Sequence, residues 1–278
     1  MEWKKAKNYT IIFLIILNLL FFVLNIIKRS EYRLSATDIS AVSDVIEKRD
    51  IVLNCELPAN FLPMGQLYMR AFEYDNLELQ EVFFGTISGV RRVDANDDII
   101  FSRDEDTLTV ASDSVSFNGM LEDIPVDMTA AGDAVQVYVD ALNDYFGDYS
   151  INIENETDEG YYFEYMQSFQ NQLVFSNYLK AWIGKDGTVQ LTFNYQQPIE
   201  YKGIREDIIS ADEAVYAASR LIDADFTAAS VDAVEKGYFL TERHGNGELA
   251  AVPQYKIYVN GGSGSYYVNA YSGDATTD

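Results

Sequence analysis

The sequence predicts an α+β protein with a single N-terminal transmembrane helix, followed by antiparallel sheets that are each packed by a helix. The first observation is an apolar run from Tyr9 to Ile27, broken only by Thr10, Asn18 and Asn25. The second is that three segments with helical spacing of apolar residues follow, each with strand-like stretches after it. No alternation of strand and helix typical of a parallel sheet is present, so antiparallel pairing is predicted.

The apolar run is long enough to cross a bilayer. Its 19 residues, at about 1.5 Å each, extend about 28 Å, close to the roughly 30 Å of a hydrocarbon core. A cleaved signal peptide is the alternative, but its apolar core would be about 7–15 residues, followed by a cleavage site of small residues. Lys28, Arg29 and Ser30 follow the run instead. An uncleaved anchor is therefore predicted.

The charges beside the run indicate its orientation only weakly, because three basic residues lie on each side. They are Lys4, Lys5 and Lys7 before the run, and Lys28, Arg29 and Arg33 after it. A short head followed by a long tail is typical of a signal anchor. We therefore expect a single-pass protein of the cell membrane with a cytoplasmic N-terminus and an extracytoplasmic C-terminal part.

The charge of the chain excludes nucleic acid as a partner. The net charge is −24, and residues 1–33 hold six basic and two acidic side chains, which leaves 14 basic and 42 acidic residues for the rest. Such a domain repels nucleic acid and anionic lipid headgroups, and it is expected to stand off the membrane that anchors it. Apolar residues make up 48% of the chain, with 20 Tyr and 16 Phe, so a folded core is expected rather than disorder.

The first helix–strand unit begins with a helix over about Thr37–Lys48, where apolar residues form one stripe. Strands are predicted after it at Ile51–Leu57, Leu67–Phe72, Leu77–Phe84, Leu108–Ala111 and Val115–Phe117.

The second unit begins with a helix over about Ala130–Phe146, and Gly147 is a suitable C-terminal stop. The strands predicted after it are Tyr161–Phe169, Leu173–Ile183 and Thr188–Tyr195, the last two joined by a turn at Gly184–Gly187.

The third helix begins at Ser210-Ala-Asp-Glu213, which has the pattern of a capping box, and continues to Ile222. Strands are predicted at Val234–Thr241, Tyr255–Asn260 and Tyr266–Tyr271, with Gly261–Gly264 as a hairpin tip. The predicted domain organisation is a cytoplasmic head (1–8), the anchor (9–27), a linker (28–36) and two exported α+β domains (37–127 and 128–278).

The residues give little sign of catalysis, and we predict neither an enzyme nor a cofactor or metal site. The chain has one histidine, His244, and one cysteine, Cys55, so a thiol–imidazole pair would need these two to meet. No zinc-ligand spacing is present. The stretch from Asp94 to Glu105 has the spacing of a calcium loop, but Ile99 stands where the sharp turn needs glycine.

The anchor itself carries the candidate site. Residues at alternating spacings of three and four form one stripe along the helix: Ile11, Leu14, Asn18, Phe21 and Asn25. An amide in hydrocarbon is costly unless it finds a partner. The stripe therefore predicts contact with another transmembrane helix. The alternative is that one or both amides are merely tolerated, Asn25 above all because it lies near the interface.

Three regions together resemble one family. The N-terminus, Met1-Glu-Trp-Lys-Lys-Ala-Lys7 with Asn18-Leu19-Leu20 in the apolar run, is similar to that of YycI (WalI) proteins. The middle, Gln167-Ser-Phe169 and Leu173–Asn177, resembles that family's strand pair. The C-terminal motifs are Ile209–Ala214, Val252–Tyr255 and Tyr266–Gly273, which resemble the closing hairpin of YycI and, more loosely, a PepSY unit at about 208–273.

The resemblance implies a non-enzymatic regulator of the YycFG (WalRK) two-component system, which controls cell-wall metabolism genes. Its partners would be the transmembrane helices of the sensor histidine kinase (WalK/YycG-like) and the sister protein YycH (WalH). Two other classes stay open. One is a membrane-displayed PepSY-like binding or protease-inhibitory module. The other is a wall-active enzyme that uses a pair of carboxylates.

Overall fold

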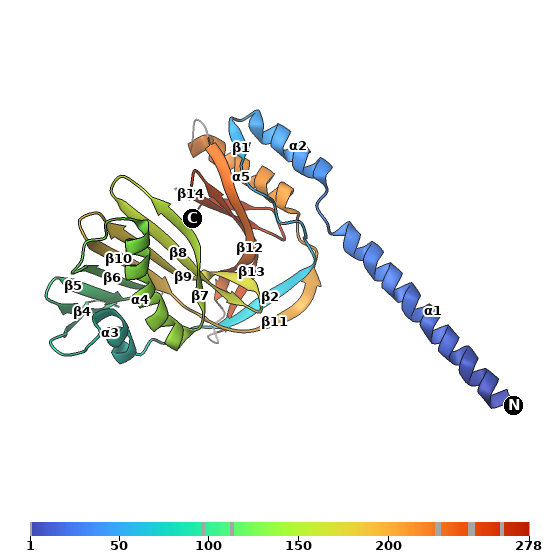
Figure 1. Cartoon of the computed structure of the whole chain (residues 1–278), viewed down its shortest axis with the longest axis horizontal. Helices are drawn as coiled ribbons and strands as arrows, with labels where there is room; N and C mark the ends of the chain where they lie inside the picture. The colour runs from blue at the N-terminus through green and yellow to red at the C-terminus, as the bar shows by residue number, and fades with distance from the viewer. Residues whose placement is uncertain are drawn as a thin grey trace.

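The computed structural model describes residues 2–95, 98–111, 114–225, 229–243, 248–261 and 264–277. A long N-terminal helix projects from a globular part (residues 32–278), in which helices pack on a curved sheet (Figure 1). The described helices are α1 (Glu2–Glu31), α2 (Ala36–Glu47), α3 (Asn76–Phe84), α4 (Met128–Phe146) and α5 (Ala211–Asp225). This arrangement confirms the predicted α+β class.

The first strands are β1 (Ile51–Leu53), β2 (Met64–Arg70), β3 (Arg91–Ala95), β4 (Asp98–Arg103), β5 (Asp106–Val110), β6 (Val115–Met120), β7 (Tyr149–Glu156) and β8 (Gly160–Phe169). The others are β9 (Gln172–Gly184), β10 (Thr188–Asn194), β11 (Gln197–Glu206), β12 (Ala229–Arg243), β13 (Glu248–Val259), β14 (Gly264–Asn269) and β15 (Ala275–Thr277).

The described strands join in one hydrogen-bonded sheet rather than in the separate sheets that were predicted. Its main path runs β11-β2-β13-β12-β9-β10-β6-β5-β4-β3. Most pairs are antiparallel, as predicted, but β1 and β9 both pair parallel with β12. The β9–β12 pair covers only two residues on each strand, and it joins the two halves of the sheet.

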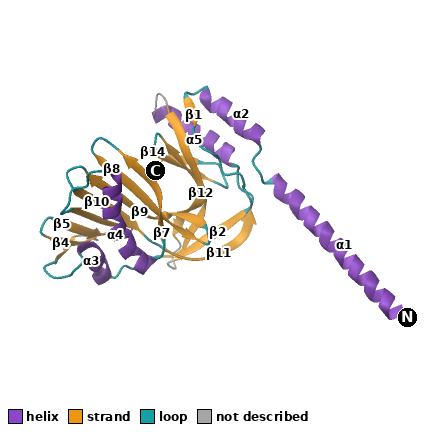
Figure 2. Ribbon diagram, viewed as in Figure 1, coloured by secondary structure: helices purple, strands orange, loops and turns teal. Residues whose placement is uncertain are grey.

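Two large clusters of buried apolar residues lie on this sheet, besides two smaller ones around Val174 and Phe175 of β9. The first is formed by α3, α4 and strands β4–β10, over residues 79–195. The second is formed by α2, α5, β1 and β12–β14, from residues 34–57 and 208–270. Figure 2 shows α4 over the strands of the first cluster and α2 beside α5 over those of the second. These cores divide the chain differently from the predicted 37–127 and 128–278 domains, because β6 and α4, on either side of that boundary, share one core.

The stretch Leu77–Phe84 was predicted as a strand and is instead the helix α3, so this prediction is wrong. The helix begins where the Asp75 carboxylate accepts a hydrogen bond from the Leu77 amide at 2.7 Å, and it ends at Gly85 in the left-handed conformation. Its buried residues have helical spacing: Leu79, Gln80, Phe83 and Phe84. The two end signals decide the structure of this short apolar segment.

The three predicted helices correspond to α2, α4 and α5. At α5 only half of the expected capping box forms: the Ser210 amide donates to the Glu213 carboxylate at 3.0 Å, while the Ser210 hydroxyl bonds Asp212. A complete capping box occurs at α2, between Ser35 and Asp38. It fixes the start of the first helix of the globular part, directly after the anchor.

Candidate functional site

The predicted stripe residues all lie on α1, whose apolar segment does not pack against the described globular part. The segment Lys7–Lys28 is 22 residues long, has a mean hydropathy of 2.8 and is 0% buried. The stripe side chains are exposed along the length of α1: Ile11 is 46%, Leu14 49% and Phe21 55% exposed. By length and composition this helix can cross a membrane, since 22 residues rise about 33 Å.

Within the part of the chain that the structure describes, the Asn18 amide has no hydrogen-bond partner. It lies near the middle of the apolar segment, where an unpaired amide in hydrocarbon is costly. Asn25 is also exposed but lies one turn before Lys28, close to the end of the segment. Asn25 lines a pocket beside the globular part, whereas Asn18 has no described residue of the globular part near it and is the amide that needs a partner.

A short pairing ties α1 to the globular part. The Leu34 amide donates to Ala59 O at 2.8 Å and the Phe61 amide to Tyr32 O at 3.1 Å. The Tyr32 hydroxyl also donates to the Asp207 carboxylate at 2.9 Å, and its ring meets Phe61 edge to face. Because these contacts begin one residue after α1 ends, the direction of the helix is coupled to the globular part.

A pocket of about 410 Å³ lies at this junction, between α1 and the sheet edge. It is lined by Asn25, Lys28, Tyr32, Leu62, Pro63 and Arg205. A second pocket of about 290 Å³ shares Leu62, Pro63 and Arg205 with it and adds Lys202 and Lys236. Basic side chains thus gather beside the end of the anchor in a strongly acidic chain.

The most buried polar pair lies far from this junction. Lys256 on β13 and Glu164 on β8 form an ion pair at 2.6 Å, with side chains 1% and 3% exposed. The Lys256 ammonium also lies 4.7 Å from the centre of the Tyr258 ring. A substrate has no access to groups this deeply buried. The pair therefore links β8 to β13 as a structural contact.

Glu235 lies next to this pair and has a perturbed pKa. Burial raises the pKa of its carboxyl, although hydrogen bonds from Asn152 and Tyr258 and the charge of Lys256 act in the opposite direction. The Tyr258 hydroxyl donates to Glu235 at 3.3 Å and accepts from the Asn152 amide at 2.6 Å. These contacts join β7, β12 and β13 across the interior of the curved sheet.

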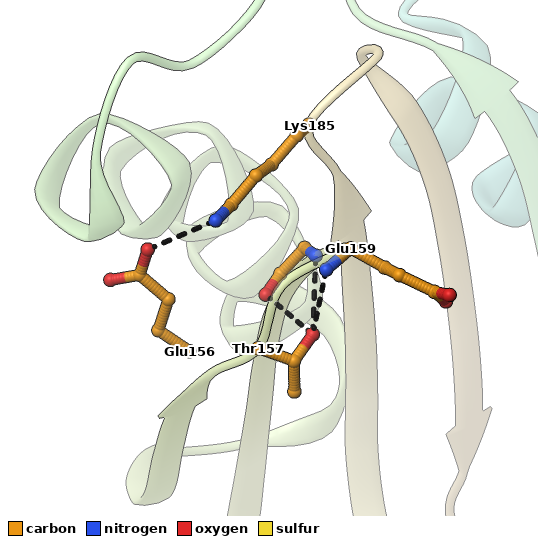
Figure 3. Close-up of polar contacts among 5 residues, drawn as sticks. Glu156, Thr157, Glu159 and Lys185 are labelled. Atoms are coloured by element: carbon orange, nitrogen blue, oxygen red, sulfur yellow. Dashed lines mark hydrogen bonds and ion pairs between the residues drawn. The ribbon is translucent and has the colours of Figure 1, made fainter.

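The turn between β7 and β8 is acidic, and Figure 3 shows the hydrogen bonds of Thr157 within it and the ion pair of Glu156 with Lys185. The Thr157 hydroxyl oxygen accepts from the amides of Glu159 and Gly160 at 3.3 and 3.2 Å. Lys185 pairs with Glu156 at 3.2 Å across the neighbouring turn. Among the described residues, no group of three or more His, Cys, Asp or Glu side chains is arranged to hold a metal ion.

The remaining candidates from the sequence have no catalytic geometry that the structure shows. Cys55 is half-buried, and burial, with the charge of Asp232 adding to it, raises the pKa of its thiol to about 11. His244 lies outside the described residues. The calcium-like stretch forms the β3–β4 hairpin, in which Asp94 pairs with Ile99, and its residues 96–97 also lie outside the described part.

No known family model matches the sequence, and no curated protein matches it. Among solved structures, an uncharacterized protein from Eubacterium rectale is similar over 82% of this chain and 90% of its own, at 10% identity and a TM-score of 0.49. The C-terminal domain of YpeB from Bacillus megaterium is similar over 75% of this chain and 98% of its own, at 11% identity and a TM-score of 0.39.

YycH from Bacillus subtilis is similar over 77% of this chain, at 14% identity and a TM-score of 0.46. The chain spans 55% of the length of that YycH structure. None of these three similarities exceeds 14% identity, so each is a distant one.

Proposed function

We propose that this protein is a membrane-anchored, non-enzymatic regulator of a two-component histidine kinase, of the YycI (WalI) and YycH type. It acts through contacts between α1 and the transmembrane helices of the kinase, and its globular part lies outside the cell as an interaction domain. One observation carries the proposal: α1 presents an apolar surface that is 0% buried, with an unpartnered amide near its middle.

The stripe on α1 has the composition of a helix–helix contact. Leu14 and Phe21 are bulky, so two helices cannot approach as closely there as they do through pairs of small residues. Side-chain packing and the Asn18 amide must then supply the affinity. A kinase helix with a polar group at the same depth satisfies the amide, which lipid cannot do.

The junction between α1 and the globular part can transmit a movement of α1 to the sheet. Tyr32 and Leu34 pair with residues 59–61 directly after α1, and Tyr32 also bonds Asp207, the residue that follows β11. A tilt or rotation of α1 is therefore transmitted to the sheet edge. The resemblance of the sequence to YycI adds the partners: a WalK-like kinase and a YycH (WalH)-like protein.

Substitution of Asn18 tests this proposal. If α1 docks against a kinase helix, Asn18→Leu weakens the pairing by about 0.6–1.7 kcal/mol, roughly 3- to 17-fold in the equilibrium constant. Crosslinking from the stripe in intact cells, or a membrane two-hybrid signal, measures this loss. Because leucine also favours insertion, reduced membrane integration does not explain a weaker signal.

A matched control moves the amide rather than removing it. The double change Leu17→Asn with Asn18→Leu rotates the amide by about 100° around the helix and is not expected to restore pairing. If Asn18→Leu leaves the crosslinking signal unchanged, α1 is not the interaction surface. The contact must then lie in the globular part.

A second experiment tests the topology. Protease added to wall-stripped cells is expected to digest the chain beyond about Arg33 and to leave a small membrane-held stub. A chain that resists digestion as a whole, or that is recovered in the soluble fraction, contradicts the proposed anchoring.

A further inference from the structure

The edge strand β11 carries an irregularity beside the anchor. Its pairing with β2 shifts register between Lys202 and Glu206, and Gly203 between them has a φ of +85°, a conformation that favours glycine. The shift forms a bulge, residues 203–205, in which the Ile204 side chain is 85% exposed. A single exposed apolar side chain is common on protein surfaces, so the position of Ile204 beside the anchor, rather than its exposure alone, makes it a candidate for contact with the membrane.

The β11 bulge lies where α1 leaves its apolar segment. Arg205 of the bulge lines the junction pocket together with Asn25 and Lys28 of α1. In Figure 1 the end of β11 curves toward the segment that joins α1 to α2. If the bilayer ends at about Ile27, Arg205 and the neighbouring Leu62, which is 44% exposed, lie at the bilayer surface.

Basic side chains gather at this edge, although the chain as a whole is strongly acidic and Glu206 and Asp207 follow Arg205 directly. Lys28 and Arg205 line the junction pocket, and Lys202 lines the pocket beside it, while the chain carries a net charge of −24. Lys202 is paired with Glu200 at 3.1 Å, whereas Arg205 makes no ion pair with any residue that the structure describes. An exposed guanidinium at a membrane surface is suited to a lipid phosphate.

We propose that the β11 bulge is a second membrane contact, in which Ile204 and Leu62 enter the headgroup region and Arg205 and Lys28 bind the phosphates of anionic phospholipids. This inference rests on the membrane anchoring of α1 proposed above. Two attachments, one through the bilayer and one on its surface, fix the angle of the globular part. They thereby set which way the α1 stripe faces.

Depth-dependent fluorescence quenching tests the contact in the full-length chain. In a Cys55→Ser background, single cysteines replace Ile204, Val126 and Ile16, and each carries an environment-sensitive nitrobenzoxadiazole label. Val126 is the matched control, because it is 87% exposed but lies between β6 and α4, beside the first core. Ile16 reports on α1 itself. Each protein is placed in nanodiscs of phosphatidylcholine with or without phosphatidylglycerol, with bromine on the lipid chains as the quencher.

We expect quenching at position 204 that is stronger with phosphatidylglycerol, no quenching at position 126, and quenching at position 16 in both lipids. Arg205→Gln, with the label at 204, is expected to lower the ratio of lipid-bound to free label roughly fivefold in phosphatidylglycerol, since one cation near an anionic surface is removed. The same substitution is expected to leave position 16 unchanged.

The three label positions distinguish failure of the anchor from failure of the second membrane contact. Quenching at 16 without quenching at 204 overturns the second contact and leaves the anchor intact. Absence of quenching at 16 overturns both the anchor and the contact that rests on it. Equal quenching at 204 in both lipids, unaffected by Arg205→Gln, overturns the preference for anionic phospholipids and the role of Arg205 in it.

Discussion

Replacement of Lys256 by methionine is expected to be among the most damaging single changes in the globular part. The Lys256 ammonium lies 2.6 Å from the Glu164 carboxylate, and the two side chains are 1% and 3% exposed. Removal of one partner leaves the other charge buried without compensation, which typically costs about 3–5 kcal/mol. At about 2–4 °C per kcal/mol for a domain of this size, the Tm is expected to fall by about 6–20 °C.

Two variants isolate the cause of this loss. In the double variant Lys256→Met with Glu164→Leu neither charge of the pair remains buried, and the neighbouring Glu235 loses the attraction of Lys256 and the repulsion of Glu164 together. Stability is therefore expected to return to that of the parent or to exceed it by up to about 4 kcal/mol. The exposed pair of Lys185 and Glu156 is the second comparison, because its side chains are 43% and 54% exposed. Lys185→Met is therefore expected to cost only about 0.2–1 kcal/mol.

The assay is thermal unfolding of the full chain in detergent, followed by near-ultraviolet circular dichroism. The reasoning is refuted if Lys256→Met lowers the Tm no more than Lys185→Met does. It is also refuted if the double variant is as unstable as the single one, because the loss would then come from altered packing rather than from an unpaired charge.

Three further predictions concern the pKa of Glu235, the thiol of Cys55 and the start of α2. Burial raises the pKa of Glu235 above its usual 4.5, so the folded state loses stability as the pH rises from 4.5 to that raised pKa. Glu235→Gln should therefore raise the Tm at pH 7 but not at pH 3. Equal gains in Tm at the two pH values would contradict this reasoning. The Cys55 pKa of about 11 against 9.0 implies roughly 100-fold slower alkylation by iodoacetamide at pH 8 in the folded chain than in urea. Ser35→Ala removes the capping box of α2 and should cost about 1 kcal/mol in thermal unfolding; an unchanged Tm would show that packing alone holds this helix.

Strands with one buried face could be predicted from the sequence because apolar residues alternate with polar ones along them. In β10, Val189, Leu191 and Phe193 are buried and alternate with more exposed residues. In β11 nearly every side chain is exposed or half-buried, because the strand lies at the edge of the sheet and pairs only with β2. No apolar alternation remains there, so the pattern of residues did not indicate that strand.

Local patterns and long-range contacts differ in the same way in how far the sequence predicts them. The α1 stripe is a local pattern, and the sequence predicts its residues directly. The Lys256–Glu164 pair joins positions that are 92 residues apart. The β11 bulge becomes a candidate membrane contact only because the fold brings Arg205 and Lys28 to the same pocket. Contacts of this kind depend on strand order, and composition or spacing does not contain that information.

The second core has a consequence for the order in which the chain can fold during synthesis. Its residues come from 34–57 and from 208–270, so α2 and β1 leave the ribosome long before the strands that cover them exist. The first core, over residues 79–195, is contiguous and can form in between. Long-range contacts of this sort fold slowly, since a large loop must close first. Residues 34–57, next to the anchor, therefore stay uncovered until the C-terminal strands arrive, and apolar surface exposed in this way is prone to aggregation.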